Sequence, residues 1–192
     1  MKRSFSFLLA PAAFALGVAC NQPAPAPVAS EVPQPTEAEL IKRGEYLVQV
    51  MGCHDCHSPK LMGPQGPYPD PERLLSGHPA STQLPPVPKD AAGWALLSMD
   101  LTAAVGPWGT SFAANLTSDE SGIGNWTEDQ FKRALKQGLY KGMEGSRPLL
   151  PPMPWQNFKD IKDEDVHAIF TYLKSTKPVA NVVPAPVPPA GV

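Results

Sequence analysis

The chain has 192 residues, of which 16 are basic, 18 are acidic and 25 are proline, and its formal charge is −2 at pH 7. No basic stripe is present, which argues against a nucleic-acid partner. The one long apolar run, at the N-terminus, is shorter than the ~20 residues of a membrane-spanning helix, so no such helix is expected.

The N-terminus has the pattern of an export signal. Lys2 and Arg3 precede an apolar run over residues 5–19, which predicts a signal peptide over residues 1–19. Residues 16–20 (LGVAC) resemble a bacterial lipobox, so we expect cleavage before Cys20 and lipid modification of its thiol. The alternative is an ordinary signal peptide cleaved elsewhere, with Cys20 lost or free. Cleavage before Cys20 leaves 14 basic and 18 acidic residues, a formal charge of −4.

Two proline-rich tails flank the central part of the chain. Residues 20–35 are expected to form an extended linker of ~3.1 Å per residue, roughly 45 Å in all. Residues 179–192 have a similar composition, which is compatible with a second spacer or with a strap lying along the domain. Residues 36–178 are long enough for one domain.

The central part predicts three helices and therefore an all-α fold. The first begins at a capping box formed by Thr36 and Glu39, and the second begins at a similar box at Thr127 and stops at Gly138. The third carries acidic residues at 163–165 and an apolar stripe at Val166, Ile169, Phe170 and Leu173. Residues 58–125 are rich in Pro and Gly and are expected to form ordered loops, with a short hairpin near residues 94–101.

Residues 53–57 (CHDCH) form the motif that attaches c-type haem. Cys53 and Cys56 are spaced to form two thioethers, and His57 follows where its imidazole can ligate iron. A redox disulfide would not need His57, and a zinc site would need two further ligands nearby, which do not follow closely. One motif predicts one covalently attached haem c.

The second axial ligand is predicted to be Met153. Pro152 and Pro154 flank it and restrict its backbone, which suits a weak thioether ligand. His78, in a turn before Pro79, is the main alternative. The other methionines considered have less distinctive settings; they are Met51, Met62, Met99 and Met143.

The order of helix, haem motif, methionine loop and C-terminal helix resembles class I cytochrome c. Over residues 39–188 the chain resembles, more narrowly, the haem domains in cytochrome subunits of bacterial periplasmic alcohol and gluconate dehydrogenases. The motifs that carry this resemblance are NLT at 115–117, GIGNWT at 122–127, Arg147, LLPPMPW at 149–155 and DED at 163–165. Those subunits carry several haems, whereas this chain has one motif.

The resemblance also implies a set of haem contacts. Gly44 is expected where the first and last helices cross, and the carbonyl of Pro64 is expected to accept a hydrogen bond from His57. Four further side chains are expected either to bind the propionates and wall the haem or to pack and face solvent in the ordinary way: Trp108, Asn115, Arg147 and Trp155.

The function predicted from the sequence is single-electron transfer by a lipid-anchored, periplasm-facing carrier with no catalytic residues. Its partners would be a dehydrogenase, an oxidase or a quinol-oxidising complex. One alternative is an obligate haem subunit of a periplasmic dehydrogenase complex. Another is an enzyme or gas sensor whose iron has an open position.

Overall fold

The computed structural model describes residues 33–88 and 93–189. The predicted signal peptide, Cys20 and most of the linker lie outside these residues, and the description concerns the compact unit that begins at Pro35. Its helices are α1 (Glu37–Val50), α2 (Cys53–His57), α3 (Glu128–Gln137) and α4 (Asp163–Ser175), with 3-10 turns η2 (Tyr140–Gly142) and η3 (Trp155–Phe158).

The predicted helix ends are confirmed. Thr36 Oγ1 accepts from the backbone N–H of Glu39 at 3.3 Å, while the Glu39 carboxylate accepts from the Thr36 N–H at 2.8 Å. Thr127 forms the equivalent box with Gln130 at the start of α3. Gly138 ends α3 with φ 67°, a left-handed conformation that glycine adopts without strain.

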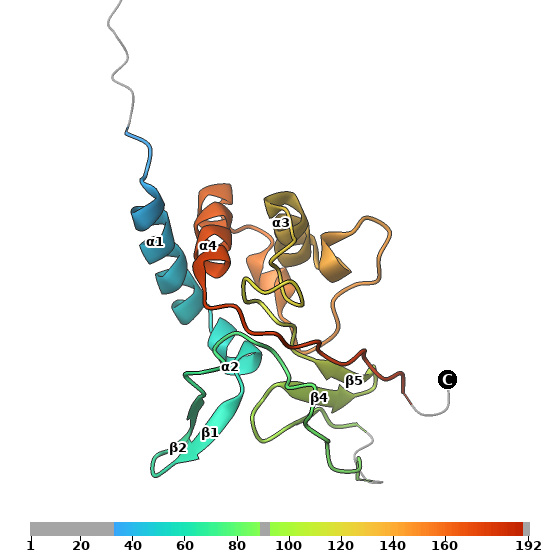
Figure 1. Cartoon of the computed structure of the whole chain (residues 1–192). Coiled ribbons are helices and arrows are strands. Elements are labelled where there is room, and N and C mark those ends of the chain that lie inside the picture. Colours follow the sequence, from blue (N-terminus) through green and yellow to red (C-terminus); the bar gives the residue numbers. More distant parts are fainter. Residues whose placement is uncertain (1–32, 89–92, 190–192) are drawn as a thin grey trace, which may run out of the picture. The chain divides into compact units, whose positions relative to one another are not determined.

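The helices α1 and α4 pack side by side (Figure 1) and contribute most of the buried core residues, which α3 and two loops complete. Gly44 lies at their contact as expected, because a Cβ there would be 2.0 Å from the Ala168 carbonyl oxygen. The two backbones can therefore approach more closely than any larger residue would allow. The buried core residues are Leu47, Val48, Leu75, Ile123, Phe131, Leu135, Val166, Ala168, Ile169 and Leu173.

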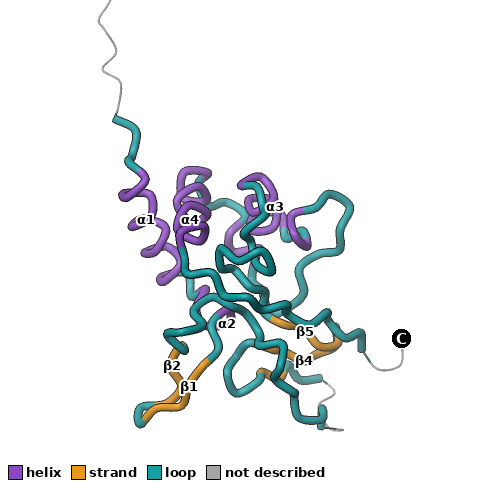
Figure 2. Tube along the Cα trace, viewed as in Figure 1, coloured by secondary structure: helices purple, strands orange, loops and turns teal. Residues whose placement is uncertain are grey.

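The prediction of loops over residues 58–125 is wrong in part, because this stretch contains two small antiparallel sheets (Figure 2). One pairs β1 (Lys60–Gly63) with β2 (Gly66–Pro69), and the other orders β3 (Leu96–Leu97), β4 (Ala103–Gly106) and β5 (Gly109–Phe112). The strands have two to four residues, too few for an alternating pattern to show. The fold is mostly helical with two small sheets, rather than all-α.

The C-terminal segment is a strap rather than a spacer, as far as it is described. Beyond α4 it runs across the domain toward β5 (Figure 1), where Thr110 and Val187 exchange backbone hydrogen bonds of 2.8 and 2.9 Å. A Cβ on Gly109 would lie 2.0 Å from the Val187 carbonyl oxygen. Glycine at this position therefore lets the strap lie directly on the strand.

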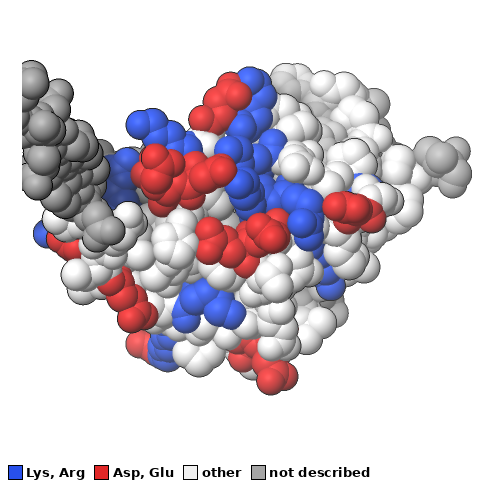
Figure 3. All heavy atoms as spheres, turned by 90° about the horizontal axis from the view of Figure 1, so that it is seen from above, with Lys and Arg blue, Asp and Glu red and all other residues white. Residues whose placement is uncertain are grey.

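Charges of both signs are mixed on the face shown in Figure 3. Lys132 and Lys136 of α3 both pair with Asp163 of α4, and Arg43 of α1 pairs with Asp165 at 3.0 Å. These pairs join neighbouring helices. Within residues 33–88 and 93–189, no helix combines the length and the apolarity needed to cross a membrane.

Candidate haem site

The haem motif forms the short helix α2, which follows α1 after a turn at Gly52 with φ 70°. Cys53 and Cys56 form no disulfide, both are partly buried, and Cys53 packs against the core. Burial raises the pKa of Cys53 to about 11, and it also raises the pKa of Cys56. The burial of both side chains therefore favours the neutral thiol form. Among the described residues, no group of three or more His, Cys, Asp or Glu is placed to hold a metal ion.

His57 is prepared as a metal ligand. Its Nδ1 lies 2.7 Å from the Ala114 carbonyl oxygen, and because a carbonyl only accepts, Nδ1 carries the proton and Nε2 the lone pair. Burial lowers the pKa of His57, against the opposing effect of the Ala114 hydrogen bond. The imidazole is therefore neutral at pH 7, as iron ligation requires. Together with two unpaired thiols on the same helix, this donor set fits a covalently attached haem.

The partner of His57 differs from the expected one. Pro64 lies in the turn between β1 and β2, because the chain leaves α2 through an extended Ser58 and enters the hairpin directly. The segment around Ala114 lies against His57 instead. A backbone carbonyl has no sequence signature of its own, so the sequence could not identify this acceptor.

Four chain segments, one of which contains His57 itself, form a frame at this ligand. Gly77 N–H donates to the His57 carbonyl at 2.8 Å, and His78 N–H donates to the Ala113 carbonyl at 2.9 Å. A Cβ on Gly77, which has φ 74°, would lie 2.5 Å from the Ala113 carbonyl oxygen. We call residues 57–58, 75–78, 113–117 and 179–181 the proximal frame.

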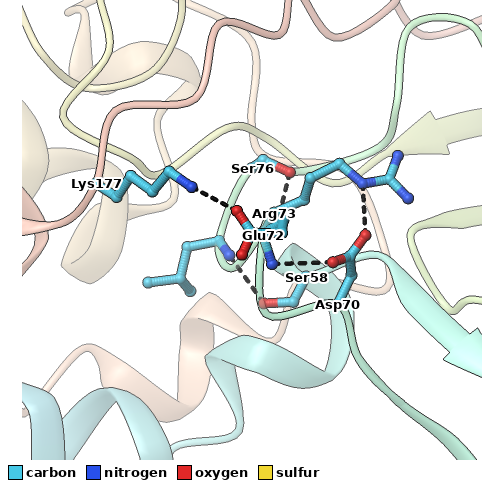
Figure 4. Close-up of polar contacts among 7 residues, drawn as sticks. Ser58, Asp70, Glu72, Arg73, Ser76 and Lys177 are labelled. Atoms are coloured by element: carbon cyan, nitrogen blue, oxygen red, sulfur yellow. Dashed lines mark hydrogen bonds and ion pairs between the residues drawn. The ribbon is translucent and has the colours of Figure 1, made fainter.

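Side chains reinforce the frame on the side of Ser58 (Figure 4). The buried Ser58 Oγ accepts from the Leu75 N–H at 2.9 Å, and Arg73 pairs with Asp70 at 2.7 Å. Ser76 Oγ donates to the Arg73 carbonyl at 2.8 Å. These contacts hold the chain between β2 and Gly77 against Ser58, the residue that follows the haem motif.

The strap closes the frame through two asparagines. Asn181 Nδ2 donates to the carbonyls of Ser76 and His78 at 2.7 and 2.9 Å, and Asn181 Oδ1 accepts from the Ala80 N–H at 3.0 Å. Asn115 Nδ2 donates to the Val179 carbonyl at 2.8 Å. Asn115 was predicted to contact the haem. In the structure its side-chain amide holds the strap. Asn181 was not singled out from the sequence, although it is a lone asparagine in a Pro- and Val-rich tail.

His78, the alternative ligand, is fully buried. Its Nδ1 lies 2.7 Å from Thr102 Oγ1, which donates to Asp100 at 2.8 Å. Its ring centroid is 4.8 Å from that of Phe112, and its Nε2 has no hydrogen-bond partner among the described residues. The side chain is directed toward Thr102 and β5.

Met153 lies in a loop over residues 148–154, the Met153 loop, and packs partly buried against the same core as Cys53. Ser111 Oγ of β5 donates to the Pro151 carbonyl at 2.5 Å, and Leu149 N–H donates to the Gly138 carbonyl at 2.6 Å. Of the other methionines, Met99 is 83% exposed and Met62 is 68% exposed.

The remaining predicted contacts lie near this loop. Trp108 Nε1 donates to Ser111 Oγ at 3.2 Å, and the ring of Trp155 lies 2.3 Å from a Cβ that would be built on Gly138. The Arg147 guanidinium stacks 4.0 Å from the Tyr140 ring centroid and donates to the Pro148 carbonyl at 2.8 Å. Trp108 and Arg147 have protein partners, the Trp155 ring lies over Gly138, and the contact of each side chain with haem remains a prediction.

Comparisons with known proteins agree with the motif. The chain is 31% identical over 155 residues to the cytochrome c subunit of quinone-dependent alcohol dehydrogenase from Gluconobacter oxydans, a match that covers 80% of this chain. It is 29% identical over 144 residues, 74% of this chain, to the gluconate 2-dehydrogenase cytochrome c subunit of Pantoea cypripedii. The chain is homologous to dehydrogenase cytochrome c subunits. The fructose dehydrogenase cytochrome subunit of Gluconobacter japonicus matches 79% of the chain at 28% identity.

The similarity covers only a small part of each relative. The chain spans about a quarter of the length of each of these three subunits, with 24 to 25% covered. No model of a protein family matches it. The predicted resemblance to these subunits is confirmed, while their activities and assemblies belong to the longer proteins.

Proposed function

We propose that the protein is a monohaem c-type cytochrome that transfers single electrons. Cys53 and Cys56 would hold the haem by thioethers, and His57 and Met153 would supply the axial ligands. The observation that carries the proposal is the geometry of His57, whose Nδ1–H is committed to Ala114 while Nε2 keeps its lone pair. When bound, the haem supplies a one-electron Fe(III)/Fe(II) couple.

The residues around the site favour a carrier over a catalyst. His57 is held by the proximal frame, and Met153 is held by prolines and by the contact of Ser111 with Pro151. Rigid ligands on both faces would leave no position for a substrate or a gas. Met ligation and partial burial would also favour a raised reduction potential.

We further propose that the protein works on the periplasmic side of a bacterial membrane. Covalent haem attachment through this motif takes place outside the bacterial cytoplasm, and the predicted signal peptide and Cys20 supply export and a lipid anchor. A thioether-linked lipid on Cys20 would tether the domain through linker residues 20–35. Replacing Cys20 with Ser should release the haem protein from membranes if the anchor exists, whereas unchanged sedimentation with membranes would exclude it.

The homology suggests which kind of protein donates electrons to the haem. Because the relatives are cytochrome subunits of alcohol, gluconate and fructose dehydrogenases, we propose a dehydrogenase as the electron donor. The protein would either exchange electrons with it as a free carrier or remain bound as a subunit. Co-purification of a dehydrogenase with the native cytochrome would favour the subunit, and recovery of the cytochrome alone would favour the free carrier.

Two variants test the proposed ligand set. Met153→Ala should keep the covalent haem but lose the sulfur-to-iron charge-transfer band of the oxidised protein, and the reduced protein should bind carbon monoxide. Met99→Ala is the matched control, because this methionine is 83% exposed, and its spectrum should equal that of the native protein. An unchanged spectrum of Met153→Ala would exclude Met153 as the ligand.

The covalent attachment is tested by intact mass. The native protein should carry the mass of one haem, and the double variant Cys53→Ala/Cys56→Ala should lose it.

A further inference from the structure

Lys60 lies three residues after His57, at the start of β1, and its ammonium group reaches back to the end of α2. Nζ donates to the carbonyls of His54 at 2.9 Å, Asp55 at 3.0 Å and Ser58 at 2.5 Å. The last carbonyls of a helix have no partner within the helix. An ammonium group has three N–H donors and no acceptor, so these three carbonyls match its full donor capacity.

The environment of Lys60 differs from that of the lysines that form ion pairs. Lys132 and Lys136 share Asp163, and Lys177 pairs with Glu72, so a carboxylate offsets each of these charges. Within the part of the chain that the structure describes, the Lys60 ammonium contacts backbone carbonyls and forms no ion pair.

The charge of Lys60 acts on the haem motif. Lys60 is partly buried, and a partly buried charge is screened by solvent less than an exposed one. Burial, and after it the positive charge of Lys60, lowers the pKa of His54 within the motif, while Asp55 and Glu45 act in the opposite direction. The ammonium lies 2.9 and 3.0 Å from two carbonyl oxygens of α2, so its charge is close to the haem motif.

We propose that Lys60 is a positioning residue that caps the haem-attachment helix and also places a positive charge beside it. The inference rests on the proposed function, since it assumes that α2 carries the haem. The cap would fix the helix end from which His57 leaves. The charge would favour the reduced state of the haem, which carries one positive charge fewer than the oxidised state, and would therefore raise the reduction potential.

Three substitutions separate the cap from the charge. Lys60→Met removes both, Lys60→Gln keeps two donors without the charge, and Lys60→Arg keeps the charge on a planar group that cannot converge on the same three carbonyls. The matched control is Lys42→Met, since Lys42 is an exposed lysine of α1.

The midpoint potential is the decisive readout, measured at low and at high salt, with thermal unfolding as the second. Lys60→Met and Lys60→Gln should lower the potential more than Lys42→Met does, and the difference should persist at high salt. Lys60→Arg should keep the potential near the native value while its unfolding temperature falls. If Lys60→Met does not fold, the Gln and Arg variants still separate the two effects.

The outcomes distinguish this inference from the proposed function. A native protein without a redox-active covalent haem would overturn both. A redox-active native protein whose potential is the same in Lys60→Gln and Lys42→Met would overturn the electrostatic role of Lys60 alone. Unchanged unfolding temperatures in Lys60→Met and Lys60→Arg would overturn the capping role.

Discussion

The two sides of the proposed haem site are built in different ways. The proximal frame joins four chain segments through hydrogen bonds, among them Gly77 to the His57 carbonyl and Asn181 to the Ser76 carbonyl. The Met153 loop depends on prolines, on packing against the core and on fewer polar contacts, such as that of Ser111 with Pro151.

This difference matches the chemistry proposed for each ligand. A histidine ligand is oriented by a hydrogen bond to its second nitrogen, so the acceptor Ala114 must itself be held in place. A thioether has no N–H to orient and needs only a backbone that does not move. Changes in the proximal frame should therefore affect folding, whereas changes in the Met153 loop should affect ligand access.

The largest effect is expected for Gly77→Ala. The new Cβ would lie 2.5 Å from the Ala113 carbonyl oxygen, at a residue with φ 74°, so strain and overlap together should lower the free energy of unfolding by about 2 to 4 kcal/mol. Gly145→Ala is the control, because φ is 72° there but no atom lies within 4 Å of the new Cβ. Urea unfolding of both variants measures the difference, and equal losses would show that the frame is not tightly packed at Gly77.

The next effect is expected for Asn181→Ala. It leaves the carbonyls of Ser76 and His78 and the Ala80 N–H without their partner, which should lower the free energy of unfolding by about 1 to 3 kcal/mol. The strap should also become sensitive to proteases. Asn157→Ala, at an exposed position of η3, should change neither property. A protease-resistant strap in Asn181→Ala would mean that the asparagine does not hold it.

A pH-dependent effect of intermediate size is expected from His78. Burial lowers its pKa, with Asp100 acting in the opposite direction, so the unfolded chain binds a proton at a higher pH than the folded protein does. Stability should be unaffected above about pH 6.5 and should fall as the pH drops from there toward the folded-state pKa.

Unfolding at pH 7 and pH 5 checks this effect. His78→Gln should lose less stability between these two pH values than the native protein does. The same loss in His78→Gln as in the native protein would remove His78 as the source of the pH dependence.

The smallest effect on stability is expected for Ser111→Ala. Losing the hydrogen bond to the Pro151 carbonyl should lower the free energy of unfolding by about 1 kcal/mol. The freed Met153 loop should open more often, so imidazole should bind the oxidised haem faster than in the native protein. A binding rate equal to the native rate would show that Ser111 does not restrain the loop.

The sequence predicted the features that depend on local chemistry. The capping boxes at Thr36 and Thr127 and the stop at Gly138 follow from nearby residue types, and the structure confirms them. The crossing at Gly44 was expected from the resemblance to class I cytochrome c, and the structure confirms it as well. The short hairpin expected near residues 94–101 is confirmed in part, because β3 pairs with β4 there. The strands β1, β2 and β5 were missed because four residues carry no readable period.

The contacts of the site were harder to predict because many use backbone atoms. The acceptor for His57 was assigned to Pro64 and is Ala114, a carbonyl brought there by distant segments. Lys60 carried a readable signal, since a lysine just beyond a helix end can bind its last carbonyls. The roles of Trp108, Arg147 and Trp155 at the haem remain predictions.

The central claim is that His57 and Met153 occupy both axial positions of the iron of a single covalent haem. The most direct test is the visible spectrum of the reduced native protein before and after carbon monoxide is added. A low-spin spectrum that does not change is the predicted result and would identify a closed electron carrier. A high-spin spectrum, or a prompt shift with carbon monoxide, would show an open iron and contradict the account.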